Sequence, residues 1–133
     1  NILAKIEANN AGAQEALILN HEGFVVEGTG DNIFFVKDGE LVTPPMWIGA
    51  LRGITRDTVI ELARGMGIPV REEPFTRYQL IAADEVFLTG TAAEIISVTR
   101  MDARSIGNGL PGPLTRKLTE KFRSIVGGDG EML

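Results

Sequence analysis

The sequence predicts a single mixed domain of the α/β or α+β class, with helices packed around a set of strands. Short apolar runs separated by turn signals predict strands in the first half of the chain. Residues 53–67 and 112–128 instead repeat apolar side chains at the spacing of a helix. No internal repeat or low-complexity segment appears in the sequence, so residues 1–133 are expected to form one domain.

The opening segment, NILAKIEANNAG (residues 1–12), places Ile2, Leu3 and Ile6 on one side of a helix. No capping or turn signal precedes this pattern. Because helix starts normally carry such signals, the chain is expected to begin inside a helix and to be a fragment of a longer protein.

Two hairpins are predicted next. Residues 15–20 and 24–28 form strands around the turn His21-Glu22-Gly23. In the second hairpin, Asp38-Gly39 joins two apolar strands, which is the strongest short-range hairpin signal, and Pro44-Pro45 ends the second strand.

Residues 53–67 predict a helix with Thr55 as the N-cap, Asp57 in the first turn and Gly67 beyond the end. The side chains expected on its inner face are Val59, Leu62, Ala63 and Met66.

The second half alternates strands and helices. Residues 68–75 predict a strand, 76–83 a short helix capped by Thr76, and 84–90 a buried strand. Residues 91–102 fit either a strand or a brief helical turn that returns to a strand. A helix over 112–128 has Pro113 near its first turn, and its inward side chains are Leu114, Leu118, Phe122 and Ile125.

The composition excludes several kinds of site and partner. Hydrophobic residues make up 44% of the chain, which is enough for a sizeable core. Thirteen basic and 18 acidic residues give a net charge of −5 without a basic cluster, so no nucleic-acid partner is expected. A sequence without cysteine excludes disulfides, thiolate catalysis and cysteine-ligated metals. No apolar run approaches the roughly 20 residues of a membrane span, so no membrane partner and a cytoplasmic location are expected.

Three junctions rich in glycine and threonine could carry chemistry: EGTGDN (27–32), LRGITRD (51–57) and TGTAAE (89–94). Gly53-Ile54-Thr55 stands at a helix start, where backbone N–H groups and the helix dipole attract an anion, although a threonine N-cap is the simpler interpretation. Thr91 and Glu94 have the spacing of a capping box, which is equally simple.

Taken together, the junctions suggest a ligand with two different ends. Two threonine and glycine corners could bind one phosphate, while Glu27 offers a carboxylate elsewhere in the same pocket. Such a pocket suits a ligand that is anionic at one end and cationic at the other, as pyridoxal phosphate is. Spacing alone does not establish that the junctions meet.

Other candidates are weaker. His21 is expected to be a solvated turn residue, and Met46 and Trp47 are expected to pack in a loop rather than to line a pocket. Acidic runs such as REE lack the spacing of a calcium loop, and no metal site is expected.

In this order, the segments NILAKIEA, EGTGDNIFFVKDG, LVTPP, LRGITRD, ADEVFLTGTAAEI and IGNGLPGPLTRKL resemble the branched-chain amino acid aminotransferases, which belong to the class IV pyridoxal-phosphate aminotransferases. The resemblance implies the large cofactor-binding domain of the D-amino acid aminotransferase-like fold, pyridoxal 5′-phosphate as cofactor, and a homodimer. It also implies transamination of Leu, Ile or Val with 2-oxoglutarate. A D-amino acid aminotransferase, an aminodeoxychorismate lyase, or a non-catalytic cofactor-binding or assembly module remain alternatives.

The resemblance also implies roles for individual residues. Glu27 would pair with the pyridine nitrogen, Leu51 would pack on the ring, and Asn32 would brace the 27–32 loop. The residues implied to bind the phosphate are Gly53, Ile54, Thr55 and Thr91. Thr91 and the backbone N–H of Ala92 would meet the substrate carboxylate.

The Schiff-base lysine of the family is expected on a segment before Asn1, together with the small N-terminal domain. The residues Lys5, Lys37, Lys117 and Lys121 do not match its position or the desolvated setting that a nucleophilic amine needs. The chain alone is therefore expected to contain no catalytic residue and to be inactive.

Overall fold

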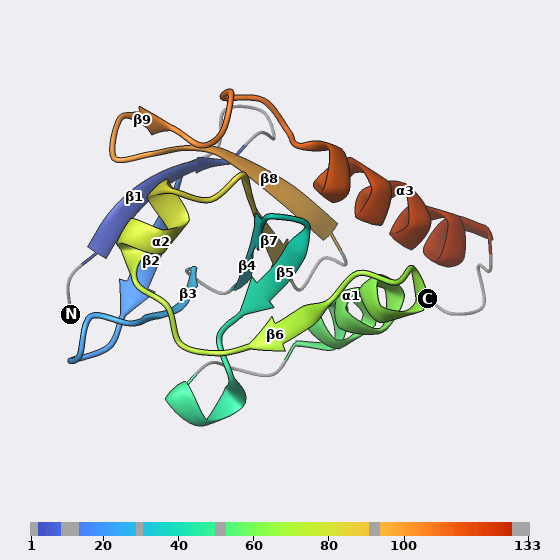
Figure 1. The fold of residues 1–133 in the computed structure, drawn as a ribbon, viewed down its shortest axis with the longest axis horizontal. Coiled ribbons are helices and arrows are strands. Elements are labelled where there is room, and N and C mark those ends of the chain that lie inside the picture. Colours follow the sequence, from blue (N-terminus) through green and yellow to red (C-terminus); the bar gives the residue numbers. More distant parts are fainter. Residues whose placement is uncertain (1–2, 9–13, 29–30, 50–52, 91–93, 129–133) are drawn as a thin grey trace.

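A mixed nine-stranded sheet forms the centre of the computed structural model, which describes residues 3–8, 14–28, 31–49, 53–90 and 94–128 (Figure 1). The strands are β1 (Leu3–Ala8), β2 (Gln14–Leu19), β3 (Val25–Gly28), β4 (Asn32–Lys37), β5 (Glu40–Thr43), β6 (Val70–Glu72), β7 (Glu85–Gly90), β8 (Glu94–Met101) and β9 (Arg104–Ser105). The helices are the 3₁₀ helix η1 (Met46–Ile48) and the α-helices α1 (Ile54–Gly65), α2 (Arg77–Ile81) and α3 (Pro113–Gly128). The strand order is β3-β2-β1-β8-β7-β4-β5-β6, with β9 paired to β8. The predicted mixed fold class is confirmed.

Both predicted hairpins are present, as β2–β3 and β4–β5. In the second hairpin, Asp38 has φ 51° and Gly39 has φ 78°. Two consecutive positive φ angles are what a two-residue type I′ turn requires, and this turn matches the right-handed twist of its strands. The local sequence therefore determined this hairpin.

Strand β5, helix α1 and strand β6 form a crossover unit. β5 and β6 are parallel neighbours, while the other pairings of the described strands are antiparallel. A helix that connects two parallel strands starts beyond the carboxyl end of the first strand. The N-terminus of α1 is thereby placed at the end of β5.

The central strands β4 and β7 are buried on both faces. Phe34 and Phe87 face α1 and α3, whereas Phe35 and Leu88 face a second core that includes Leu80 of α2. Helices α1 and α3 lie side by side at one end of the molecule, and α2 lies at the other (Figure 1). Double burial explains why these strands are continuous apolar runs rather than alternating ones.

Two helix starts carry side-chain caps. Thr76 caps α2, and its backbone N–H bonds to Oε1 of Gln79 at 3.1 Å, as the sequence predicted. The start of α3 is held by Glu85 of β7, whose Oε1 accepts from the backbone N–H of Thr115 at 2.7 Å and from its hydroxyl at 2.7 Å. Oε2 of Glu85 accepts from the N–H of Leu114 at 3.1 Å. A carboxylate at a helix N-terminus also interacts favourably with the helix dipole.

Several predictions about the elements were wrong. Residues 3–8 form strand β1 instead of a helix, because β2 and β8 pair with it on both sides, and such pairing overrides a short ambiguous pattern. The expectation of a chain that begins inside a helix therefore loses its premise. Met66 does not lie on the inner face of α1 but is 38% exposed, since the helix ends at Gly65. Residues 94–101 are a strand, which resolves the alternative left open there.

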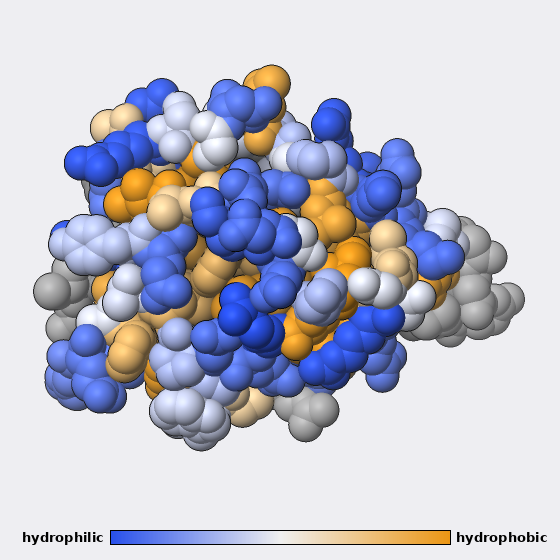
Figure 2. All heavy atoms as spheres, in the orientation of Figure 1, coloured by the Kyte–Doolittle hydropathy of each residue, from blue (hydrophilic) through white to orange (hydrophobic). Residues whose placement is uncertain are grey.

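Polar side chains cover much of one face of the molecule, with smaller apolar patches between them (Figure 2). Among the described residues, none of the helices is both long and apolar enough to cross a membrane.

We expect the variant Glu85→Ala to lower the free energy of unfolding by about 2–3 kcal/mol, since two N–H groups and one hydroxyl lose a charged acceptor. Urea denaturation followed by circular dichroism measures the loss. Glu85→Gln keeps one acceptor oxygen and should lose less. The control Glu120→Ala changes an exposed glutamate of α3, the helix whose start Glu85 holds. Its free energy of unfolding should stay within about 0.5 kcal/mol of the parent. Equal stability of the two alanine variants would contradict the capping role.

Candidate functional site

The three glycine and threonine junctions meet around Asp31 and Asn32. Gly28 and Asp31 close the first junction by exchanging backbone hydrogen bonds of 2.9 and 3.2 Å. Gly28 also packs on β7, because a Cβ atom placed on it would lie 3.2 Å from Cδ2 of Leu88. The ends of β3 and β4 are thus joined to the middle of the sheet.

The second junction contacts the first through Asn32. This side chain is buried, with 8% of its surface exposed, and a Cβ atom placed on Gly53 would overlap its Oδ1. Gly53 has φ −100°, which any residue can adopt, so the close approach and not the backbone conformation requires glycine here. Asn32 therefore fixes the residue that precedes α1.

The third junction lies next to the same pair. Thr89 is the neighbour of Asn32 in the β4–β7 ladder. Beyond it, a Cβ atom placed on Gly90 would lie 2.8 Å from Oδ1 of Asp31. The end of β7, the start of β4 and the start of α1 consequently form one continuous region.

The N-terminus of α1 in this region has no capping side chain on its N-cap residue. Gly53 is the N-cap residue and α1 begins at Ile54, so the prediction of Thr55 as the N-cap was wrong. Thr55 lies instead within the first turn and is 8% exposed. First-turn N–H groups without a capping side chain are suited to bind an anion.

Thr89 carries an unusual polar atom. Its side chain is 2% exposed, and its Oγ1 has no hydrogen-bond partner in the part of the chain that the structure describes. A buried hydroxyl without a partner costs about 1–3 kcal/mol. Such an orphan beside an uncapped helix start is consistent with a site that is completed by a polar ligand.

Glu27 lies near the end of β3, next to the Gly28–Asp31 pair that links β3 to β4. A bulge interrupts the β2–β3 pairing, because Val25 pairs with Leu19 while Glu27 pairs with the neighbouring Ile18. Val25 and Leu19 belong to the core under α2, so Glu27 faces away from that core. Asn32 and Thr89 also face away from it, on the face that carries Phe34 and Phe87. Glu27 and the polar side chains near the start of α1 therefore lie on the same face of the sheet.

These residues fit the polarity of pyridoxal phosphate. The glycines at 53 and 90 let the side chains of Asn32 and Asp31 approach the backbone closely, the first turn of α1 offers N–H donors, and Glu27 is a half-buried carboxylate. The arrangement can bind a phosphate at one end and a cationic ring at the other.

Three of the predicted site residues, Leu51, Thr91 and Ala92, lie outside the described residues. The predicted capping box of Thr91 and Glu94 was wrong, because Glu94 begins strand β8 and pairs with Gly90. A strand cannot provide the helical third position that a capping box needs.

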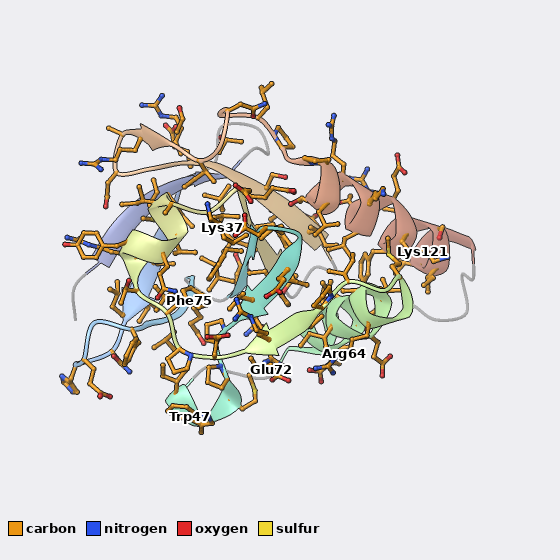
Figure 3. All side chains as sticks on the ribbon, viewed as in Figure 1. Lys37, Trp47, Arg64, Glu72, Phe75 and Lys121 are labelled. Atoms are coloured by element: carbon orange, nitrogen blue, oxygen red, sulfur yellow. The ribbon has the colours of Figure 1, made fainter. Side chains whose placement is uncertain are left out.

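The other candidates do not join this region. His21 is exposed in its turn, as predicted. Trp47 is 78% exposed and projects from η1, so the prediction that it packs in a loop was wrong (Figure 3). Lys37 is half exposed and lies 3.8 Å from Asp84, while Lys117 and Lys121 are exposed on α3.

Two further groups are notable for their electrostatics. On α2, the hydroxyl of Tyr78 lies 3.4 Å from the guanidinium of Arg77, and this hydrogen bond lowers the pKa of the phenol. Tyr78 is 67% exposed, which is typical of a surface pair. Among the described residues, no cluster of three potential metal ligands occurs.

Sequence reasoning missed two residues of the region, Thr89 and Arg56. Thr89 ends an apolar strand, and nothing in its neighbours signals an unpaired hydroxyl. Arg56 follows Thr55 in the first turn of α1 and is buried, with 3% of its side chain exposed. A cation in a first turn opposes the helix dipole, and this conflict is the signal that could have identified it.

Comparison with known proteins identifies a family and several similar proteins. A model of the family described as Amino-transferase class IV matches residues 1–101. The chain is 58% identical over 125 residues to a Methanocaldococcus jannaschii protein provisionally assigned as a branched-chain-amino-acid aminotransferase, covering 94% of this chain and 43% of that protein. It is 45% identical over 131 residues to the branched-chain-amino-acid aminotransferase of Escherichia coli K12, covering 98% of this chain and 42% of the relative. The chain thus spans less than half the length of these curated relatives.

Solved structures give the same result. The branched-chain aminotransferase of Thermoproteus uzoniensis, crystallised with norvaline, superposes with a TM-score of 0.81 at 52% identity, over 86% of this chain and 37% of that one. A second branched-chain amino acid aminotransferase, complexed with N-(5′-phosphopyridoxyl)-L-glutamate and denoted T.th. for its organism, superposes with a TM-score of 0.83 at 48% identity, over 89% of this chain and 40% of that one.

We expect Gly53→Ala to destabilise the chain by about 1–3 kcal/mol, because the new methyl group overlaps Oδ1 of Asn32. In the Asn32→Ala background the same change should cost clearly less, so that a double-mutant cycle measured by urea denaturation reports the contact. Gly65→Ala is the control. It lies in α1 with nothing within 4 Å of its added Cβ, and it should be neutral or slightly stabilising. Additive costs in the cycle would contradict the contact.

Proposed function

Because the chain belongs to the class IV aminotransferase family, we propose that the whole protein is a pyridoxal-phosphate-dependent aminotransferase of branched-chain amino acids. It transfers the amino group of Leu, Ile or Val to 2-oxoglutarate. The relatives named above, two of them branched-chain aminotransferases with solved structures, support this assignment.

One observation carries the proposal furthest. The uncapped start of α1, the buried Asn32 and the unpaired hydroxyl of Thr89 lie together at the ends of three strands. Backbone N–H groups and hydroxyls bind phosphate oxygens well, and the dipole of α1 adds a favourable field. The phosphate of the cofactor therefore belongs at this end of the site.

Within the site, the chain's own residues divide the work. The N–H groups of Gly53, Ile54 and Thr55 and the hydroxyl of Thr55 hold the phosphate, with Thr91 completing the subsite, and Leu51 packs on the ring. Glu27 keeps a proton on the ring nitrogen, since a nearby carboxylate favours the charged form. Thr91 and the N–H of Ala92 orient the substrate carboxylate. When bound, pyridoxal phosphate supplies the electron sink for the carbon that carries the amino group.

We assign residues 1–133 to the large cofactor-binding domain. The Schiff-base lysine and the small domain then belong to the part of the protein outside these residues, consistent with a chain that spans less than half of its relatives. The lysines Lys37, Lys117 and Lys121 are exposed and do not provide the desolvated setting of a nucleophilic amine. The protein is cytoplasmic and acts as a homodimer in this proposal.

Binding of pyridoxamine 5′-phosphate tests the two ends of the site separately, because this ligand lacks the aldehyde that reacts with surface lysines. Thr55→Ala should weaken its binding about three- to tenfold and leave the binding of pyridoxamine, which lacks the phosphate, unchanged. Glu27→Gln should weaken both ligands about tenfold, since both carry the ring nitrogen. Isothermal titration calorimetry measures these affinities.

Two matched controls accompany these variants. Thr119→Ala removes a hydroxyl that bonds to the carbonyl of Thr115 on α3, and Glu22→Gln removes an exposed charge in a turn. Both should bind like the parent chain. A parent chain that binds neither ligand, or variants that bind like the parent, would overturn the assigned roles.

The lysine assignment is tested in the longer protein. After incubation with pyridoxal phosphate and reduction with borohydride, mass spectrometry should find the cofactor attached to one lysine outside residues 1–133. The 133-residue chain treated in the same way should show no single stoichiometric site and no transamination. Specific labelling of Lys37, Lys117 or Lys121 would refute the assignment.

A further inference from the structure

We propose that Arg56 is a positioning residue, which holds the first turn of α1 in the orientation that binds phosphate. The inference rests on the function proposed above. Arg56 lies on α1, and two of its hydrogen-bond partners, Pro44 and Glu72, lie outside this helix.

The guanidinium of Arg56 is buried and makes three hydrogen bonds. Nη2 donates to Oε1 of Glu72 at 2.8 Å and to the carbonyl of Pro44 at 3.2 Å, and Nη1 donates to Oδ1 of Asp57 at 3.2 Å. Only 3% of the arginine side chain is exposed, whereas Glu72 is 37% exposed. The guanidinium of Arg56 is therefore desolvated, while the carboxylate of Glu72 keeps contact with water.

These bonds join three elements at one point. Arg56 belongs to the first turn of α1, Pro44 directly follows β5, and Glu72 ends β6. β5 and β6 are paired at this level, with Thr43 opposite Glu72. On its other side, the start of α1 touches Asn32 of β4 through Gly53. The first turn is held from two sides, and the N–H groups proposed to bind phosphate lie between the two contacts.

The arrangement is costly for stability. A cation in the first turn opposes the dipole of α1, and burial of a charge costs several kcal/mol unless partners offset it. Nε of Arg56 is buried and has no hydrogen-bond partner among the described residues. A buried ion pair can often be replaced by an apolar side chain without loss of stability. The presence of the charged Arg56 at this position is explained if its hydrogen bonds set the direction of the start of α1.

A cleft of about 290 Å³ lies beside Arg56, and its lining includes Arg56, Glu72 and Arg64. Arg64 lines the same cleft further along α1 and is 57% exposed, with Nη2 only 3.9 Å from Glu72 (Figure 3). Arg64 thus shares the acidic partner of Arg56 but does not reach Pro44 or the first turn. It provides a matched control.

The experiment compares Arg56→Met and Arg64→Met in the 133-residue chain. Each variant is titrated with pyridoxamine 5′-phosphate and with pyridoxamine, and its thermal midpoint is recorded. Arg56→Met should weaken the phosphorylated ligand about tenfold, because misaligned N–H donors lose charge-assisted hydrogen bonds, while pyridoxamine changes less than about twofold. Arg64→Met should leave both affinities unchanged.

Arg56→Lys serves as a second variant in case the methionine variant does not fold. A lysine keeps the charge but lacks the planar fork that reaches three acceptors, so the phosphate-specific loss should remain. Folded Arg56 variants that bind the phosphorylated ligand like the parent overturn the proposal, as does an equal loss for both ligands. If Thr55→Ala weakens phosphate binding and the Arg56 variants do not, the proposed function stands and only the positioning role fails. A parent chain without phosphate-dependent binding overturns both.

Discussion

The register of β4 against β7 is the constraint on which the site depends. It sets Asn32 opposite Thr89 and stacks Phe34 on Phe87 with ring centroids 4.9 Å apart. A slip by one residue would turn every side chain of β4 to the other face of the sheet. Asn32 would then leave Gly53, and the start of α1 would lose its contact with the sheet. The stacked rings, buried among side chains of α1 and α3, oppose such a slip.

Two buried polar side chains in and beside the candidate site are less well satisfied than other buried polar groups of the described structure. Glu85 and Thr43 make short hydrogen bonds, at 2.7 Å each, to α3 and to the carbonyl of Ile33. Thr89 and Arg56 instead keep buried atoms without partners. Natural proteins accept such local costs at functional sites and recover the stability elsewhere. The contrast supports the proposal that a ligand binds near Thr89 and the start of α1.

The sequence predicted the elements whose signals are local. Asp38-Gly39 specifies its turn by φ angles alone, and the helix over 53–67 has its apolar spacing and its terminal Gly67 within one segment. The first strand was missed because it forms by pairing with β2 and β8. Both of these strands lie outside residues 1–12, so the pattern of that segment does not record the pairing. Exposure of Trp47 likewise follows from its position on η1, outside both cores.

The sequence predicted which junctions could form the candidate site, but not that these junctions meet in space. Spacing identified Glu27 and Gly53–Thr55 as candidates, and resemblance to a family gave them roles. That Asn32 touches Gly53, while Asp31 lies against Gly90, depends on strand order and could not be derived from composition or periodicity. The unpaired atom of Thr89 is a property of packing, which a sequence does not record.

The edge of the sheet at β6 bears on how copies of this domain can associate. β6 has three residues and is flanked by Pro69 and Pro74. Its exposed Arg71 is bound to Glu40 at 3.0 Å and to Glu73 at 3.1 Å. Prolines and charged side chains discourage an incoming strand from hydrogen-bonding to an edge. Concentrated solutions of the domain are thereby protected from fibrous growth at this end, and two subunits would not extend the sheet by pairing at β6.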